Sequence, residues 1–345
     1  IIPETYALPQ ELGSCVAAVT RSNSVVPWIV KPNKLSRGRG IYLVNHPDMI
    51  PKGDDTAVVV SRYIPNPLLL DGFKFDLRLY VLVTSFQPLE VYIYKKGFSR
   101  LASKKYTRDL DSLDDAYIHI TNSSIQTENK RNENKRGNVH KCKLTLEETL
   151  ALLRRAHSVV DTAKLLGEIH RVVLAAIVSM NHVVSSNPNC FELFGFDVLI
   201  DDRLKPWLIE VNSSPSLKIE SLIDFQIKRS LIRDVLRLIN PCLYDRKKLA
   251  SLFLRRMKTG QWSQSMPRST LELRQQINDE LQHILTANFE SELHDNHTGD
   301  DQSKEVVPGD FVRLAPSPLS ERLQNVKEKI EATATDRLHE DKKCR

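Results

Sequence analysis

The sequence predicts an α+β protein, in which strand-like and helix-like segments occupy mostly separate stretches of the chain. Two observations lead to this fold class. Short runs rich in β-branched and aromatic residues stand between turn-forming residues, as in strands, and aliphatic residues recur elsewhere at steps of three and four, as on helices. We expect strands at 25–31, 57–64, 75–86, 89–94, 191–200 and 205–212. We expect helices within 146–184, at about 222–239, within 246–290 and at about 319–340.

The length of 345 residues leaves room for two domains, or for one domain with appended segments. We place a first domain at 1–90 and a second at 91–240, followed by a basic helical extension at 241–290. The stretch 291–345 begins with few hydrophobic residues, which favours a mostly disordered tail with one helix. No signal peptide or apolar run of about 18 residues is visible, so we expect a cytoplasmic protein without a membrane partner.

Positive charge is concentrated in one part of the chain. The net charge is +6, yet residues 241–345 contain 17 basic and 17 acidic residues, so the excess lies upstream. Residues 227–258 contain ten basic and two acidic residues, and such a stretch suits an acidic partner. Aromatic residues are not interleaved with these bases, so we do not expect a nucleic-acid partner.

A predicted hairpin carries three oxygen-bearing side chains. Glu210 and Asn212 alternate along the strand 205–212 and therefore point to the same face. A symmetric turn centred on Arg203-Leu204 places Asp197 opposite Glu210, with Cβ atoms about 5 Å apart. Two carboxylates that close repel each other unless a cation sits between them, and oxygen ligands without histidine suit Mg²⁺. The alternative is a set of surface polar residues on a half-exposed sheet.

A glycine loop follows the first predicted strand. Lys31 ends that strand, and Gly38 and Gly40 lie in the loop before the next apolar run. Glycines let backbone N–H groups approach phosphate oxygens, and the lysine adds a positive charge. The pattern is neither a Walker A motif nor a GxGxxG fingerprint. It predicts a phosphate-binding loop, with an ordinary hairpin turn as the alternative.

Two further polar clusters favour a bound nucleotide. Lys74, Asp76 and Arg78 alternate on one face of the strand 75–86 and just before it, opposite an apolar face. Side chains of both charges on one strand face favour contacts with a ligand over simple exposure to solvent. The run HITN at 119–122 adds a histidine, a threonine and an asparagine, whose alternative role is a turn cap.

These motifs, in this order, resemble the tubulin–tyrosine-ligase-like family, and its polyglutamylating members most. The resemblance spans roughly 28–218. It implies an ATP-grasp fold, with its central domain at 1–90 and its C-terminal domain, which holds the metal site, at 91–240. It also implies that the small N-terminal domain of the family is absent. The matching runs are WIVKP…SRGRGIYLV, VVVSRYIPNPLLL, FKFDLRLYVLVTS, HITN and CFELFGFDVLID…LKPWLIEVNSSPSL.

The resemblance also implies roles for individual residues. Mg²⁺ would bind to Asp197, Glu210 and Asn212. Catalysis would rest on Lys74 and on Arg78, our candidate for stabilising the anionic intermediate. The implied ATP contacts are Lys31, Arg37, Gly38, Ser61, Arg62, Tyr63, Ile64, Lys74, Phe75, Asp76, Thr121 and Asn122. The implied substrate contacts are Arg37, Arg100, Ser124, Lys141 and Lys228.

By the same resemblance, the protein is a monomeric ATP-dependent protein–glutamate ligase. ATP would activate a glutamate side chain of a tubulin C-terminal tail as an acyl phosphate, and the α-amine of free L-glutamate would attack it. The basic stretch 227–258 would bind microtubules, which places the protein on the cytoskeleton, with the cilium, flagellum and basal body as candidate sites. Two alternatives stay open: an inactive microtubule-binding homologue and a protein glycine ligase.

Overall fold

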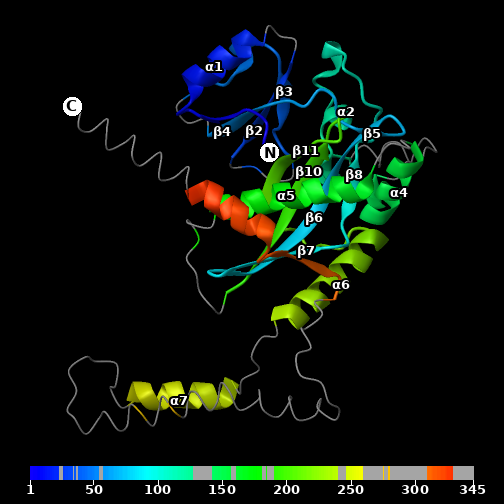
Figure 1. Ribbon diagram of the computed structural model, residues 1–345. Coiled ribbons are helices and arrows are strands. Elements are labelled where there is room, and N and C mark those ends of the chain that lie inside the picture. Colours follow the sequence, from blue (N-terminus) through cyan, green and yellow to red (C-terminus); the bar gives the residue numbers. More distant parts are fainter. Residues whose placement is uncertain are drawn as a thin grey trace, which may run out of the picture. The chain divides into compact units, whose positions relative to one another are not determined.

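The computed structural model describes residues 1–22, 26–33, 35, 38–53, 57–126, 142–156, 161–180, 184, 190–239, 246–258, 275, 279 and 309–328 (Figure 1). The chain forms two compact units, one of Ile1–Arg233 with Asp310–Arg345 and one of Asp234–Gly309. The first unit mixes helices with antiparallel sheets, which confirms the predicted α+β class. None of the helices described in these ranges is both long enough and apolar enough to cross a bilayer.

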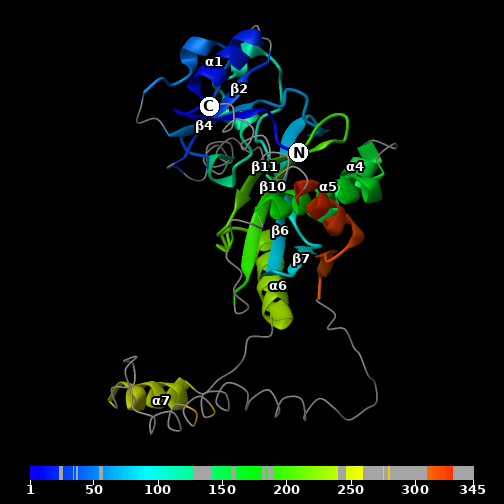
Figure 2. The same cartoon turned by 60° about the vertical axis from the view of Figure 1, so that its left-hand side comes forward.

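The N-terminal part of the first unit is a small sheet covered by one helix. The strands run in the order β1-β4-β2-β3 and are antiparallel where they pair. In the helix, Cys15, Ala18 and Val19 recur at helical spacing and pack on Trp28 and other buried residues of the sheet (Figure 2). The elements are β1 (Thr5–Leu8), α1 (Leu12–Arg21), β2 (Trp28–Pro32), β3 (Tyr42–Val44) and β4 (Val58–Arg62).

The larger sheet has eight strands and is built around one long strand, β6 (Phe73–Phe86). Its hydrogen-bonded strand order is β11-β10-β6-β7-β12, and the shorter strands β5, β8 and β9 extend the sheet at the start of β6. The predicted pairs at 75–94 and 191–212 are both present. The other strands are β5 (Leu69–Leu70), β7 (Leu89–Tyr94), β8 (Phe98–Leu101), β9 (Lys143–Thr145), β10 (Glu192–Ile200), β11 (Pro206–Asn212) and β12 (Phe311–Ala315).

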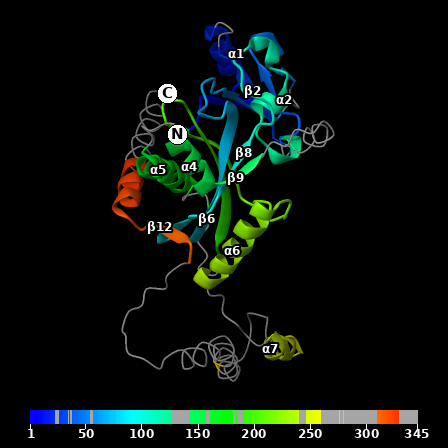
Figure 3. The same cartoon turned by 90° about the vertical axis from the view of Figure 1, so that its right-hand side faces the viewer.

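The two faces of β6 have different neighbours. Phe75, Leu77 and Leu79 are almost fully buried and share one core with residues of the helices α4 (Leu146–Ala156) and α5 (Thr162–Met180). Figure 3 shows these two helices on one side of the sheet. Side chains at the even positions of β6 therefore point to the opposite face, where the candidate site lies. Short helical segments at Pro47–Met49, Leu110–Ser112, α2 (Ala116–His119) and 123–126 complete this part.

The predicted basic helices are present where the chain is described. The helix α6 (Leu222–Ile239) matches the expected 222–239, and α7 (Arg246–Lys258) covers the start of the expected 246–290. The remainder of that segment lies outside the described residues, apart from 275 and 279.

The prediction of disorder is wrong for residues 309–317, whereas the helix expected at about 319–340 is present at 318–328, where the chain is described. The strand β12 pairs antiparallel with β7, and a helix at 318–328 follows it. Side chains of β12 pack on the larger sheet, because the ring of Phe311 contacts that of Tyr94 at a centroid distance of 4.8 Å and Leu314 belongs to the main core. A strand of five residues gains its stability from such pairing, which local composition does not report. The expected domain boundary at residue 90 also falls inside the larger sheet, whereas the two sheets separate between 62 and 69.

Candidate active site

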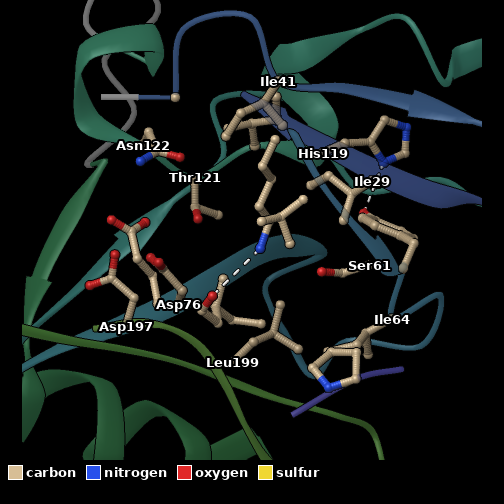
Figure 4. A pocket seen from close by; sticks show the side chains of 18 of the residues that line it. Ile29, Ile41, Ser61, Ile64, Asp76, His119, Thr121, Asn122, Asp197 and Leu199 are labelled. Carbon is tan, nitrogen blue, oxygen red and sulfur yellow. Dashed lines mark hydrogen bonds between the residues drawn. The ribbon is translucent and has the colours of Figure 1, made fainter. Parts of the chain in front are cut away.

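A cavity of about 480 Å³ lies within the first unit, lined by residues of both sheets. Its volume falls in the range of roughly 300–1,000 Å³ that is typical of small-molecule sites. Figure 4 shows that Ile29, Ile41 and Ile64 lie on one side and Asp76 and Asp197 on the other. The cavity thus has an apolar end and an acidic end. The predicted site residues that line it are Lys31, Gly38, Ser61, Arg62, Tyr63, Ile64, Lys74, Asp76, Arg100, Thr121, Asn122, Asp197 and Glu210.

The glycine loop comes very close to the HITN segment. Gly38 has φ of +77°, and a Cβ at this position would lie 3.0 Å from the Cβ of Asn122 and 2.9 Å from Cδ1 of Ile125. Any side chain would therefore be strained twice, by the left-handed backbone and by the contact. The glycine is required for the loop to pass beside Asn122 at the cavity wall.

The two predicted metal carboxylates are direct neighbours across β10 and β11. Asp197 pairs with Glu210, as the sequence predicted, and Gly195 pairs with Asn212. Asn212 donates from Nδ2 to the carbonyl of Gly195 at 3.3 Å. Asp197 is buried, whereas Glu210 is open to the cavity.

The turn that sets this pairing differs from the prediction. The hairpin closes between Asp201 and Lys205, so that three residues centred on Arg203 form the turn. The Asp201 carboxylate accepts hydrogen bonds from the backbone N–H groups of Arg203 and Lys205, both at 2.9 Å. A bulge then restores the predicted register, because Leu208 and Glu210 on β11 are two steps apart where their partners Val198 and Asp197 on β10 are one step apart.

The extra residue of the bulge is Ile209, and its backbone faces the cavity. Its carbonyl accepts a long hydrogen bond of 3.5 Å from Nζ of Lys31. Partial burial lowers the pKa of Lys31, while Glu210 and Asp197 act in the opposite direction. The amine of Lys31 therefore lies within the electrostatic influence of the carboxylate pair.

Alternating charges surround Asp197. Arg78 donates to its two oxygens at 2.5 and 3.0 Å, and Arg100 donates to Oδ2 at 2.7 Å. Arg100 also bonds to Asp76 with Nε and Nη2. Burial works against ionisation of Asp197, but the two guanidinium groups outweigh it and lower the pKa of the carboxyl group. The cluster fixes the acidic end of the cavity as a rigid, charged surface.

The donor set fits a hard divalent cation. The pKa of Glu210 is raised by partial burial and then by the charge of Asp197, and a cation between the two carboxylates would relieve this repulsion. Among the residues that the structure describes, no three His, Cys, Asp or Glu side chains are close enough to form a metal site by themselves. Two carboxylates and an amide, completed by water and phosphate, are a ligand set suited to Mg²⁺.

Lys74 lies at the wall of the cavity in an unusual environment. It is buried, and Nζ donates to the hydroxyl of Tyr63 at 2.9 Å and to the carbonyl of His119 at 2.7 Å. Burial lowers the pKa of this lysine to about 7, with Lys31 acting in the same direction and Asp76 opposing it. Lys74 and Lys31 thus place two amines in one cavity, and a bound phosphate would favour the protonated form of each.

Several predicted residues do not line the cavity. Phe75 is part of the main core, on the face of β6 opposite Lys74, so its side chain does not face the cavity. Arg78 reaches the site only through Asp197, and Asn212 lies beyond the lining residues. Ser124 is not among the lining residues either. Arg37 and Lys141 lie outside the described residues.

Lys228 also lies elsewhere. Its Nζ is 2.9 Å from Asp224, one turn earlier on α6, and Lys143 contacts the same carboxylate at 2.8 Å. Asp224 is fully buried, and these hydrogen bonds outweigh its burial and lower its pKa to about 2. Lys143 therefore joins β9 to the start of α6, and Lys228 adds a second positive charge beside the same carboxylate. The four-residue spacing of Asp224 and Lys228 was the sequence signal for this pair.

The sequence reasoning missed the apolar lining. Ile29, Ile41, Leu199 and Leu208 line the cavity, and none was assigned to the site. For Ile29 a signal existed, since it stands two residues before Lys31 on the same strand and shares its face. The others come from separate segments, and only the fold brings them together.

Comparison with known proteins identifies relatives of the chain. A model of the Tubulin-tyrosine ligase family matches residues 1–249. The probable alpha-tubulin polyglutamylase Ttll1 of Tetrahymena thermophila is 38% identical over 253 residues, which are 70% of this chain and 60% of that protein. Human tubulin polyglutamylase TTLL5 is 38% identical over 269 residues, or 73% and 20%. The human probable tubulin polyglutamylase TTLL2 is 42% identical over 245 residues, or 69% and 40%.

These matches confirm the resemblance found in the motifs. The aligned region spans between 20% and 60% of the length of the three relatives.

Proposed function

Because the chain belongs to the Tubulin-tyrosine ligase family, we propose that it is an ATP-dependent protein–glutamate ligase that modifies glutamate side chains of tubulin C-terminal tails. The observation that carries this proposal is the cross-strand pair of Asp197 and Glu210 at the acidic end of a cavity whose other end is apolar. An adenine ring suits the apolar end, and triphosphate with Mg²⁺ suits the acidic end. Two sheets that line one cavity also support the ATP-grasp assignment.

Each part of the cavity has a task in this proposal. The segment from Ser61 to Ile64 contacts the adenine, and the loop at Gly38 brings backbone N–H groups to the phosphates. Asp197, Glu210 and Asn212 would hold Mg²⁺, which would neutralise negative charge on the phosphates. Lys31 and Lys74 add two positive charges, which offset the charge that develops during phosphoryl transfer.

The arginines act on the carboxylate substrates. The hydrogen bonds from Arg100 to Asp76 and Asp197 use Nε and Nη2, so Nη1 is the donor that these bonds do not use. We assign it to the carboxylate of the incoming glutamate, with which a guanidinium forms strong hydrogen bonds. Arg78 orients Asp197, beside which the γ-phosphoryl group of ATP passes to the acceptor carboxylate, giving an acyl phosphate and ADP. The α-amine of free glutamate then attacks, phosphate leaves, and an isopeptide bond forms.

The acceptor is selected by charge. Residues 227–258 carry ten bases and two acids, and α7 alone contains Arg246, Lys247, Lys248, Arg255, Arg256 and Lys258. A surface of this sign attracts the acidic tails of microtubules, over a Debye length of about 8 Å at physiological salt. The protein accordingly acts as a monomer on the cytoskeleton, including that of the cilium, flagellum or basal body.

Incorporation of labelled glutamate into taxol-stabilised microtubules with Mg-ATP tests the proposal. We expect incorporation by the unaltered chain and a loss of at least tenfold in Glu210→Gln, since a neutral amide replaces a charged metal ligand. Glu192→Gln is the matched control, because Glu192 is exposed on β10 and does not line the cavity.

Labelled glycine separates the alternatives. Incorporation of glycine in place of glutamate would keep the chemistry and replace the donor. If neither amino acid is incorporated while the protein still pellets with microtubules in a salt-sensitive manner, the ligase proposal is wrong and a binding protein remains.

A further inference from the structure

We propose that Tyr63 and His119 are positioning residues, which hold the ammonium group of Lys74 toward the phosphates of the nucleotide through hydrogen bonds of fixed direction. The inference rests on the nucleotide site of the proposed function, and it gives the Tyr63 hydroxyl and the His119 ring a task that the reaction scheme above does not assign to them. Both residues line the cavity together with Lys74.

The direction of the chain of hydrogen bonds starts at a backbone carbonyl. Nε2 of His119 lies 3.1 Å from the carbonyl oxygen of Ser112, and a carbonyl can only accept. Nε2 therefore carries a proton. Burial lowers the pKa of His119 to about 4, and the charge of Lys74 acts in the same direction, so the ring is neutral at physiological pH. A neutral imidazole has one N–H, which leaves Nδ1 as an acceptor.

Tyr63 is the next member. Its hydroxyl lies 3.1 Å from Nδ1 of His119, so the hydroxyl must donate its proton to the ring. The oxygen lone pairs of Tyr63 are then directed at other donors, and Nζ of Lys74 donates to this oxygen at 2.9 Å. If the imidazole were protonated at Nδ1, the same hydroxyl could not donate to it. The tautomer set by Ser112 thus makes Tyr63 an acceptor for the lysine.

Lys74 is held on two sides by this arrangement. Its ammonium group has three N–H donors, of which one binds Tyr63 and a second binds the carbonyl of His119 at 2.7 Å. The ring of Tyr63 also lies near the charge, with its centroid 4.4 Å from Nζ. One N–H is left for a ligand in the cavity that Lys74 lines. The acceptors favour the charged form of a lysine whose pKa burial has lowered to about 7.

The site geometry predicts which ligands depend on this arrangement. In the proposed orientation of ATP, the ammonium group of Lys74 interacts with the phosphates, whereas the apolar end of the cavity contacts the adenine base. Loss of the Tyr63 hydroxyl should therefore weaken ATP and leave adenosine unaffected. A general disturbance of the adenine-binding segment would instead weaken both ligands.

Calorimetric titration of the full chain with Mg-ATP and with adenosine tests the inference, for Tyr63→Phe, for Lys74→Met and for the double variant. We expect Tyr63→Phe to weaken ATP about tenfold, the usual effect of losing a hydrogen bond to a charged group, with adenosine affinity unchanged. In the Lys74→Met background, Tyr63→Phe should have no further effect on ATP. Tyr94→Phe is the matched control, since it removes the hydroxyl of another buried tyrosine that does not line the cavity.

Three results would overturn the inference: unchanged ATP affinity in Tyr63→Phe, an equal loss for ATP and adenosine, or additive losses in the double variant. Thermal unfolding of Tyr63→Phe beside Tyr94→Phe guards against a folding defect, and His119→Gln gives a second variant of the same chain of bonds. If the unaltered chain binds neither ligand, the nucleotide site and the inference fall together. ATP binding without transfer of glutamate would refute the ligase proposal but would leave the inference on Tyr63 and His119 standing.

Discussion

The two carboxylates that we assign to the metal should respond in opposite ways when their charge is removed. Asp197 is 1% exposed and accepts three hydrogen bonds from Arg78 and Arg100. Asp197→Asn keeps the size of the side chain but removes the negative charge and turns an amide N–H₂ toward a guanidinium. Glu210 is open to the cavity and, among the described residues, takes part in no such arginine pair.

The expected magnitudes follow from these surroundings. Removal of one partner of a buried ion pair costs about 3–5 kcal/mol, because the remaining charge is left uncompensated. For Glu210, removal of the charge should change the free energy of unfolding in the opposite direction. Its pKa is raised in the folded protein by partial burial and by Asp197, so the ionised form is disfavoured there and lowers stability at pH values above its ordinary range. Glu210→Gln removes this penalty, and we expect the free energy of unfolding to stay equal or to rise.

Urea unfolding at pH 7 without nucleotide measures both effects, and titration with Mg-ATP should show that both variants lose magnesium-dependent binding. Equal stability of Asp197→Asn and the unaltered chain would refute the role of the arginine cluster. A clear destabilisation by Glu210→Gln would refute the reasoning on repulsion between the carboxylates.

Three other predictions concern the fold around the site. The folded pKa of Asp224 is lowered to about 2 from 3.8, so its stabilisation is present above pH 3.8 and is lost as the pH falls toward 2. Asp224→Asn should therefore lower the free energy of unfolding by about 2 kcal/mol at pH 7. The urea midpoints of the variant and of the unaltered chain should become equal near pH 2, and a difference that persists at that pH would contradict this. Phe311 is 3% exposed, and Phe311→Ala should cost about 3 kcal/mol in the same assay; an unchanged midpoint would mean that β12 adds nothing to the sheet. Gly38→Ala should weaken ATP binding through strain and its contact with Asn122, whereas Gly72→Ala, at φ +85° but 3.7 Å from its nearest neighbour, should leave ATP binding unchanged.

The parts of the site that the sequence predicted depend on short-range periodicity. Lys74 and Asp76 alternate with Phe75, and the strand places the charged pair at the cavity and the phenylalanine in the core. Assigning Phe75 to the nucleotide therefore contradicted the alternation from which the site was built. A family motif lists neighbours in sequence, whereas a strand sends each neighbour to the other face.

The parts that the sequence did not predict depend on distant partners. Lys228 was assigned to the substrate by the family resemblance, yet it pairs with Asp224, a carboxylate that also binds Lys143. Arg100 was assigned to the substrate and Arg78 to catalysis, and both donate to Asp197, which lies 97 and 119 residues further along the chain. Residue type predicts that a buried charged side chain will have a partner of opposite charge, but the fold determines which residue that partner is.

The hairpin of β10 and β11 shows how a correct pairing can follow from an incomplete reason. A two-residue turn centred on Arg203-Leu204 would have placed Asp197 opposite Glu210 without any irregularity. The observed turn is one residue longer, because the Asp201 carboxylate holds the backbone N–H groups of Arg203 and Lys205. Such a turn alone would have shifted Glu210 out of register, and the bulge at Ile209 compensates for it. The bulge also presents the Ile209 carbonyl to Lys31. One inserted residue therefore sets both the carboxylate pair and a contact of the phosphate-binding lysine, which makes the bulge part of the site and not a defect of the strand.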